Sequence, residues 1–429
     1  MSRATGEGTG ERLRLSLDVT AVPARPMGAG RYTLDLAAAL ATRDDVELAL
    51  VSRANDAERW RELAPAATLE SLAPGYRPAR LAWEQTRQPQ LLSRLGVEVH
   101  HSPHYTMPER ATVPRVVTIH DLTFFDHPEW HQRSKVSLFR RATRVAARHA
   151  EALVCVSEAT ANRLRERFTP AGPVHVVRHG VDHLRFRPDE PAPGADAHIL
   201  THLGISGPYV AFIGTFEPRK DVPTLVRAFD RMAAAHPDLR LVLAGQPGWG
   251  KADVEAAVSQ ARQSDRVICT GYIPDAAVPA LLRQATAVAY PSLVEGFGLP
   301  ALEALACGTP LVTTTGSAMQ EVAEGAALLV EPGDLDGLAG ALDMVVRGDD
   351  SLAGRQSRGL SIAARHTWAA SAAGHLAAYR AARQSAAGGH AGGSRDASHS
   401  DTSENSDTSE NSDASENSDA DVNGRGDAR

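Results

Sequence analysis

The chain has 429 residues, of which 43% are apolar, enough for two domains with substantial cores. The net charge of −7 is explained by residues 386–429, which hold ten acids against three arginines. The remainder is neutral, so charge indicates neither nucleic-acid binding nor an acidic catalytic surface. Three scattered cysteines (Cys155, Cys269 and Cys307) argue against disulfides and zinc. Without a secretory signal or an apolar run of about 20 residues, we expect a cytoplasmic protein.

Both ends of the chain are low in apolar residues. Residues 1–11 are polar and glycine-rich, and the hexapeptide S-D-T-S-E-N occurs at 400–405 and 406–411, with a variant at 412–417. Such segments bury too little apolar surface to offset the entropy lost on ordering. We therefore expect disorder over 1–11 and 386–429.

Between the ends, short apolar runs alternate with helical patterns, which predicts parallel sheets flanked by helices. The runs are 13–17, 46–51, 97–101, 116–119 and 152–156, then a second series at 174–177, 209–213, 241–244, 267–270, 287–290 and 311–314. A Pro/Ala/Gly-rich stretch at 187–204 interrupts the pattern. We predict an α/β protein with two Rossmann-like, doubly wound domains facing a cleft. They would span 12–190 and 207–365, with a linker at 191–206 and a C-terminal helix at 366–385 that packs back on the first domain.

The loop from Glu295 to Gly298 leads from a predicted strand into a helix that begins at Pro300. Its glycines and the helix N-terminus favour an anion or sugar hydroxyls. Glu295 and Glu303 could accept hydrogen bonds from hydroxyl groups, of a sugar and a ribose respectively. The alternative is a tight corner with two solvated glutamates.

Three other predicted strand ends carry polar groups. Arg219 offers a planar guanidinium group that can donate two hydrogen bonds at once, and Lys220 offers a compact positive charge. Together they suit a diphosphate, although such a pair often lies on the solvated surface with no ligand. The segment G-A-G-R-Y-T (28–33) resembles a phosphate loop, but Thr33 breaks the dinucleotide fingerprint, and a plain turn is the alternative. His120 could contact a donor or acceptor hydroxyl, with Asp121 orienting it or capping the next turn, and both could equally be structural.

Across about residues 13–380, the chain is similar to the family 4 retaining glycosyltransferases of GT-B fold. It most resembles the branch that contains bacterial mannosyltransferases of surface-polysaccharide biosynthesis. The segments that carry the resemblance are G-A-G-R-Y-T (28–33), H-S-P-H-Y-T-M-P (101–108), V-V-T-I-H-D-L (116–122), V-S-E-A-T (156–160), E-P-R-K-D (217–221), P-S-L-V-E-G-F-G-L-P-A-L-E-A-L-A-C-G-T-P (291–310) and E-V-A-E-G-A-A-L-L-V-E-P (321–332).

The resemblance implies a role for each matching position. Arg219 and Lys220 would hold the diphosphate, Glu295 the donor sugar and Glu303 the ribose, while His120 would lie beside the transferred sugar. The other donor-binding positions implied are Gly30, Gly214, Phe297, Gly298 and Leu299. In one departure, His179 stands where the family usually has Asn before Gly-Val-Asp, and we expect this to alter only loop detail.

The implied reaction is the retaining transfer of a hexose, best matched by mannose from GDP-mannose, to a growing, lipid-linked glycan. A nucleoside diphosphate is a stable leaving group, so the strong acid that glycosidases need is not required. We expect no cofactor and no metal. The D-x-D sequence at 334–336 reads as a helix N-cap, and its second copy, at 419–421, lies in the tail.

Residues 132–150 contain no acid but six cations: Arg133, Lys135, Arg140, Arg141, Arg144 and Arg148. All except Lys135 share one face at helical spacing. This predicts either a solvated basic helix or docking to anionic lipid on the inner face of the cell membrane.

Rival functions remain open. A sugar-nucleotide epimerase of the same architecture would not be expected to combine Glu295 and Glu303 with Arg219 and Lys220. The incomplete glycine fingerprint speaks against a nicotinamide-dependent dehydrogenase, and the sequence does not distinguish a non-catalytic sugar-nucleotide sensor. UDP-, dTDP- and ADP-sugars are alternative donors.

Overall fold

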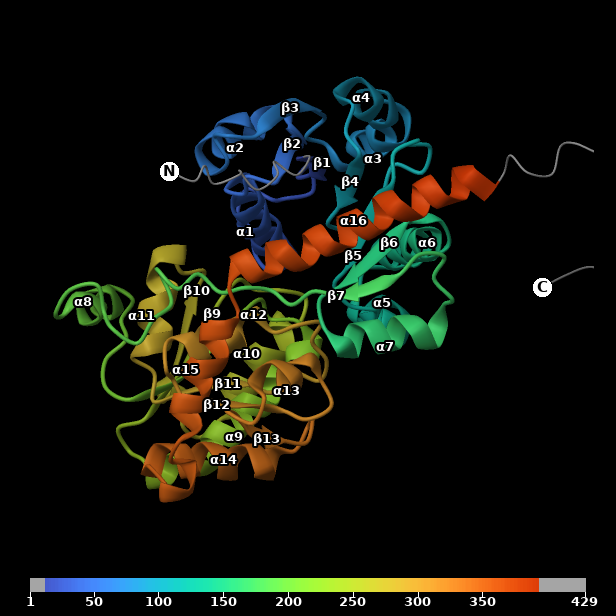
Figure 1. The fold of residues 1–429 in the computed structure, drawn as a ribbon. Helices are drawn as coiled ribbons and strands as arrows, with labels where there is room; N and C mark the ends of the chain where they lie inside the picture. Colours follow the sequence, from blue (N-terminus) through green and yellow to red (C-terminus); the bar gives the residue numbers. More distant parts are fainter. Residues whose placement is uncertain (1–11, 393–429) are drawn as a thin grey trace, which may run out of the picture. The chain divides into compact units, whose positions relative to one another are not determined.

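The computed structural model describes residues 12–392, with side chains as far as residue 387. The expectations for 1–11, for the repeats at 400–417 and for the D-x-D sequence at 419–421 lie outside this range. Within it the chain forms two parallel sheets, of seven and six strands, each covered by helices (Figure 1). The predicted α/β class with two doubly wound, Rossmann-like domains is therefore confirmed.

The first sheet has the strand order β3-β2-β1-β4-β5-β6-β7. Its strands are β1 (Leu13–Asp18), β2 (Val46–Arg53), β3 (Thr68–Ala73), β4 (Val99–Ser102), β5 (Arg115–Ile119), β6 (Ala152–Cys155) and β7 (Val174–Val176). The helices of this domain are α1 (Ala29–Ala41), α2 (Ala57–Leu63), α3 (Arg77–Thr86), α4 (Gln88–Leu95), α5 (Thr123–Asp126), α6 (Arg133–His149) and α7 (Glu158–Arg167).

The second sheet has the order β10-β9-β8-β11-β12-β13. Its strands are β8 (Tyr209–Ile213), β9 (Arg240–Ala244), β10 (Val267–Gly271), β11 (Ala287–Tyr290), β12 (Leu311–Thr314) and β13 (Leu328–Val330). The helices that follow the first domain are α8 (Ala195–His202), α9 (Val222–Met232), α10 (Lys251–Gln260), α11 (Val278–Arg283), α12 (Leu299–Ala306), α13 (Ala318–Ala323), α14 (Leu335–Arg347), α15 (Arg355–Arg365) and α16 (Trp368–Gly392).

Some elements differ from the sequence expectations. β3 is an edge strand that buries only Ala73, so it gives no clear apolar run. The other strand missing from the predicted runs is β13, an edge strand of three residues. β7, grouped above with the second series of runs, pairs with β6 in the first sheet. The segment expected to be a linker contains α8, because Leu200 and Ile205 anchor it in the second core. α16 continues beyond the predicted end at residue 385.

Each sheet has a point where the strand order reverses, between β1 and β4 in the first and between β8 and β11 in the second. Loops that leave neighbouring strands diverge at such a point and leave a crevice for a ligand. The loop after β8 carries Arg219 and Lys220, and the loop after β11 carries Glu295. The pairing of β8 with β11 therefore brings these side chains to the same crevice.

Helix α16 returns to the first domain and buries Leu376 in its core (Figure 1). A buried chain of hydrogen bonds, with links of 2.7–2.9 Å, fastens it there. In order, the chain runs through Tyr379, His101, Thr118, Tyr32, His375 and Ser371. Because the Ser371 carbonyl can only accept, His375 donates from Nδ1 and its Nε2 accepts from Tyr32. Protonation of Nε2 would turn this acceptor into a donor toward Tyr32 and so change the direction of the chain.

We predict that acid weakens this attachment. Burial lowers the pKa of His375 to about 4 from 6.5, so between these values only the unfolded state binds the proton. Stability is lost as pH falls through this window, by about 1.4 kcal/mol per pH unit for one histidine. A His375→Gln variant keeps an acceptor but does not titrate, so denaturation midpoints measured from pH 7 to 4.5 should fall less steeply.

His202→Gln is the control, because His202 is exposed and bonds only within its own helix. It should keep the wild-type slope. Equal slopes for His375→Gln and wild type would contradict the role of His375.

Candidate functional site

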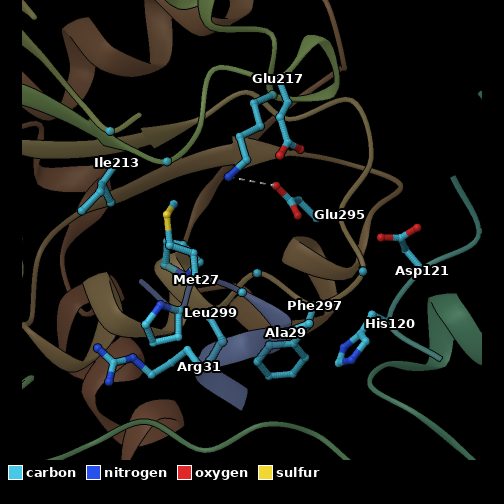
Figure 2. Close-up of a pocket in the computed structure, with 18 of the residues that line it drawn as sticks. Met27, Ala29, Arg31, His120, Asp121, Ile213, Glu217, Glu295, Phe297 and Leu299 are labelled. Atoms are coloured by element: carbon cyan, nitrogen blue, oxygen red, sulfur yellow. Dashed lines mark ion pairs between the residues drawn. The ribbon is translucent and has the colours of Figure 1, made fainter. Parts of the chain in front are cut away.

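A cavity of about 400 Å³ is lined by loops from both domains (Figure 2). Nine of the ten predicted site residues line it: Arg219, Lys220, Glu295, His120, Gly214, Phe297, Gly298, Leu299 and Glu303. The loops after β8 and β11 supply most of these, and His120 follows β5. The structure therefore brings together residues that are almost 200 positions apart in the sequence.

The charged centre of the cavity is one ion cluster. Arg219 Nη1 lies 2.5 Å from Glu295 Oε2. Lys220 Nζ lies 3.9 Å from Glu295 Oε1, the ion pair that the dashed line at Glu295 marks in Figure 2. Glu217 adds a second carboxylate, 2.7 Å from Arg219 Nε. Burial opposes ionisation of Glu295, but the two cations hold its pKa below the usual value. Burial lowers the pKa of Lys220, and Glu295 opposes that shift. Glu295 and the two cations thus stabilise each other's charge.

Gly214, at the end of β8, leaves space for this cluster. A Cβ atom there would lie 2.6 Å from Lys220 Nζ, closer than real Cβ contacts. A side chain at position 214 would therefore displace the ammonium group from the cavity wall.

Glu303, in the second turn of α12, lies at another part of the cavity wall. Burial raises its pKa to about 8, although Arg31 and Arg185 lower it. At neutral pH Glu303 is therefore mostly protonated, and it can donate as well as accept a hydrogen bond from a hydroxyl. Arg31 also forms an ion pair with Asp275, and Arg185 donates to the Asp275 carbonyl at 2.8 Å. The sequence analysis gave neither arginine a role, although Arg31 lies in the motif at 28–33, because their partner Asp275 follows a strand of the other domain.

His120 is oriented by the main chain. Its Nε2 lies 2.8 Å from the carbonyl oxygen of Pro103, which can only accept, so Nε2 carries the proton. Burial lowers the pKa of the ring, which is neutral and offers Nδ1 as an acceptor. Asp121 does not orient His120, because its Oδ1 accepts from the main-chain and side-chain groups of Thr123.

Gly30 is the predicted residue that does not line the cavity. It lies in the first turn of α1, buried against Pro23 and Pro26, where a Cβ atom would lie 3.1 and 3.2 Å from their side chains. Gly28, Ala29 and Arg31 form this part of the cavity wall instead. Gly30 thus packs against these prolines, and its role beside the phosphates stays a prediction.

A contact that the sequence did not suggest joins the two domains beside the site. A Cβ atom on Gly296 would overlap the carbonyl oxygen of His120, so only glycine allows these loops to approach. Ser157 Oγ donates to the Gly296 carbonyl at 2.7 Å and also caps α7. Thr160 Oγ1 lies 3.3 Å from the carbonyl oxygens of both His120 and Gly296. We call Ser157, Thr160 and Gly296 the interdomain clasp.

His179, the departure from the family pattern, also lines the cavity and is 4% exposed. Its ring centroid lies 4.5 Å from that of Phe297 and 4.7 Å from that of Tyr32. Burial keeps its pKa well below the usual value, and its Nδ1 is buried without a hydrogen-bond partner. His179 thus forms part of the cavity wall behind Phe297, which we had not expected.

Three large apolar side chains that are at least 39% exposed, Met27, Trp249 and Tyr272, also line the cavity. They come from the loops after β1, β9 and β10. This part of the wall offers apolar and aromatic surface, whereas the centre offers charge.

Two further predictions concern residues outside the cavity. Asp334 caps α14 by accepting from the Gly337 amide at 2.9 Å, as the first D-x-D sequence suggested. On α6, however, Arg140 is turned inward and donates to the carbonyl of Phe124, so the basic face is smaller than expected. Across residues 12–392, no helix is long and apolar enough to cross a bilayer.

Two family models match the chain. "Glycosyltransferase Family 4" matches residues 26–185, and "Glycosyl transferases group 1" matches residues 204–359. The first covers most of the N-terminal domain and the second most of the C-terminal domain, so together they account for both walls of the cavity.

Curated relatives include an O-antigen chain mannosyltransferase B of Escherichia coli, 27% identical over 80% of this chain and 92% of the relative. The alpha-maltose-1-phosphate synthase of Mycolicibacterium smegmatis is 34% identical over 50% of this chain and 57% of the relative. The D-inositol 3-phosphate glycosyltransferase of Segniliparus rotundus is 31% identical over 67% of this chain and 62% of the relative. The chain thus spans nearly all of the first relative but less than two thirds of the other two.

Known structures share the fold. Sucrose-phosphate synthase of Thermosynechococcus elongatus superposes with a TM-score of 0.69 at 21% identity, over 86% of this chain and 98% of that one. Anabaena HepE, in complex with UDP and glucose, superposes with a TM-score of 0.65 at 19% identity, over 89% of this chain and 100% of that one. At such identities the likeness establishes the GT-B fold alone.

We predict that Ser157→Ala lowers the free energy of unfolding by about 1–3 kcal/mol. The substitution removes a helix N-cap and a buried hydrogen bond to the Gly296 carbonyl. Urea denaturation measures the loss. Ser259→Ala is the control, since that hydroxyl bonds to an exposed carbonyl of its own helix, and it should have little effect. Equal free energies of unfolding for Ser157→Ala and Ser259→Ala would contradict a stabilising role of the interdomain clasp.

Proposed function

Because the chain belongs to the family 4 glycosyltransferases of GT-B fold, we propose that it transfers mannose from GDP-mannose to a growing, lipid-linked glycan. The observation that carries the proposal is the ion cluster of Arg219, Lys220 and Glu295 between two domains. Two buried cations beside a carboxylate, in the crevice of a doubly wound sheet, suit a sugar joined to a diphosphate. The mannosyltransferase relative, which the chain covers almost completely, supports the sugar.

In this proposal Arg219 and Lys220 bind the diphosphate and stabilise the charge that develops when it leaves. Cations fixed in advance by Glu295 and Glu217 need little reorganisation during the reaction. Glu295 accepts from a hydroxyl of the sugar, and the protonated Glu303 is bonded to the ribose. The amides of Phe297, Gly298 and Leu299, at the N-terminus of α12, face sugar and phosphate oxygens.

His120 acts from the opposite domain. Its unprotonated Nδ1 can accept a hydrogen bond from the transferred sugar, and Pro103 keeps the ring in this orientation. Attack on the face from which the diphosphate leaves, with that diphosphate as the base, would retain the anomeric configuration. The interdomain clasp holds His120 against the donor loop and helps to exclude water from the cavity.

We propose that transfer needs no metal ion. The cations that would neutralise the diphosphate are side chains, and Asp334 of the D-x-D sequence is engaged as a helix cap. In the part of the chain that the structure describes, no group of three or more His, Cys, Asp or Glu side chains is placed to bind a metal.

The acceptor and the location of the enzyme are part of the same proposal. We place it in the cytoplasm, bound to the inner face of the cell membrane through the exposed Arg133, Arg144 and Arg148 of α6. The protein should co-sediment at low salt with vesicles that contain anionic lipid. Absence of binding under these conditions would refute the membrane contact without affecting the donor site.

We predict that Lys220→Ala and Glu295→Ala each lower turnover about 100- to 1,000-fold, the cost of removing one preorganised charge in other enzymes. Both variants should fold. Arg219 stays paired with Glu295 in the first variant and with Glu217 in the second. Transfer from GDP-mannose and from UDP-, dTDP- and ADP-sugars measures the effect and identifies the donor.

Lys251→Ala, which breaks only an exposed ion pair with Glu255, is the control and should keep full turnover. Wild-type turnover of either site variant would show that the cluster is not the catalytic centre. Interconversion of sugar nucleotides without an acceptor would identify an epimerase instead.

A further inference from the structure

The chain crosses between the two domains twice. On the way out it passes from Val177 in the first core to Val181 in the second. It returns between Ala363 of the second core and Trp368, which packs against the first core. The two crossings are joined by a hydrogen bond of 3.0 Å from the Val181 amide to the His366 carbonyl. A pair of adjacent crossings is where one domain can rotate against the other.

Each crossing carries an arginine, and one carboxylate of the second domain bridges the two. Arg178 Nη1 lies 3.3 Å from Glu324 Oε1, and Arg365 Nη2 lies 2.6 Å from Glu324 Oε2. Arg178 also donates two bonds to Glu321, of 3.0 and 3.1 Å. Glu321 lies in α13, and Glu324 is the residue that ends this helix. The end of α13 therefore holds both crossings in place.

Glu324 has a backbone conformation that favours glycine. Its φ is 43° and its ψ is 38°, in the left-handed region that is costly for a residue with a Cβ atom. Glycine is the usual residue in this conformation at the C-terminus of a helix. What glutamate adds here is the bridge between Arg178 and Arg365. Strain of this kind is concentrated at functional positions, which directs attention to the bridge.

Glu321 reaches the first domain as well. Its carboxylate accepts from the main-chain amides of Glu158, at 3.0 Å, and Ala159, at 3.3 Å, in the first turn of α7. Unpaired amides and the helix dipole both favour a negative charge at this end of a helix. The N-cap of the same helix, Ser157, donates to the Gly296 carbonyl in the interdomain clasp. Glu321 thus holds the turn of α7 that in turn holds the loop after β11.

We propose that Glu321 and Glu324 are positioning residues that hold the two domains closed around a bound nucleotide. Glu324 fixes the two crossings, and Glu321 fixes α7. Rotation at the crossings would break these bonds and separate Gly296 from His120. Both carboxylates lie outside the cavity and act on it through α7. The inference rests on the proposed function, because a sugar nucleotide is the ligand that closure would retain.

The first test compares Glu321→Ala and Glu324→Gly with the wild type, using the full chain without ligand. X-ray scattering in solution measures the radius of gyration, which should be larger in both variants because the domains separate. The matched control is Glu255→Gln, which alters only an exposed ion pair with Lys251 in the second domain. It should scatter like the wild type.

The second test measures how fast a bound nucleoside diphosphate leaves, with GDP, UDP, dTDP and ADP each tried. Tryptophan fluorescence in a stopped-flow chase reports release, since Trp249 lines the cavity. The rate should rise about tenfold or more in Glu321→Ala, which loses charge-assisted bonds to the main chain. It should rise about two- to fivefold in Glu324→Gly, whose ion pairs are partly exposed.

Glu324→Gly also separates positioning from folding. Relief of the strained backbone offsets the lost ion pairs, so its urea denaturation midpoint should stay near that of Glu255→Gln. A purely structural role of Glu324 would not give a variant that is fully folded, more open and faster to release the nucleotide.

The outcomes separate the claims. The inference is overturned if either glutamate variant has the wild-type radius of gyration, or if a nucleoside diphosphate leaves either variant at the wild-type rate. If the wild type binds none of the four diphosphates, the proposed function fails. The scattering alone then decides whether Glu321 and Glu324 hold the domains closed.

Discussion

The site depends on the contact between Gly296, in the loop after β11, and the carbonyl of His120. A Cβ atom at position 296 would overlap that oxygen, so glycine alone lets the two domains meet here. Ser157 and Thr160 stabilise the contact by donating to main-chain carbonyls rather than to side chains. His120 then faces the loop that carries Glu295 and Phe297, and the separate halves form one cavity. Only in this arrangement do the polar groups of both loops line the same cavity.

Both domains contribute charge to the cavity wall: Arg31 comes from the first domain and the ion cluster from the second. The second domain holds Arg219 and Lys220 against Glu295, so that these buried charges stabilise each other. Glu217 also bonds to Arg219, so this buried cation has two carboxylate partners. The first domain contributes neutral histidines, because burial lowers the pKa of both His104 and His120. In the proposed function, phosphate is thus bound mainly by the second domain, and the neutral His120 of the first domain bonds to a hydroxyl group.

Local patterns in the sequence were sufficient for the α/β class and for the loops that line the cavity, because buried parallel strands give apolar runs and their ends carry polar groups. The order of the strands was not predictable, so the meeting of Arg219 with Glu295 followed only from the pairing of β8 with β11. Edge strand β3 lacked a readable pattern. The motif at 28–33 does not reveal which of its glycines faces the cavity, and Ser157 bonds to a residue 139 positions away.

The central claim is that the ion cluster at the reversal point of the second sheet binds a sugar's diphosphate. Calorimetry with the nucleoside diphosphate and the monophosphate of one base tests it most directly. We expect the wild type to bind the diphosphate at least about tenfold more tightly, because only its β-phosphate reaches Lys220, and we expect Lys220→Ala to abolish the difference. Equal affinities in the wild type, or a preference that survives the substitution, would contradict the account.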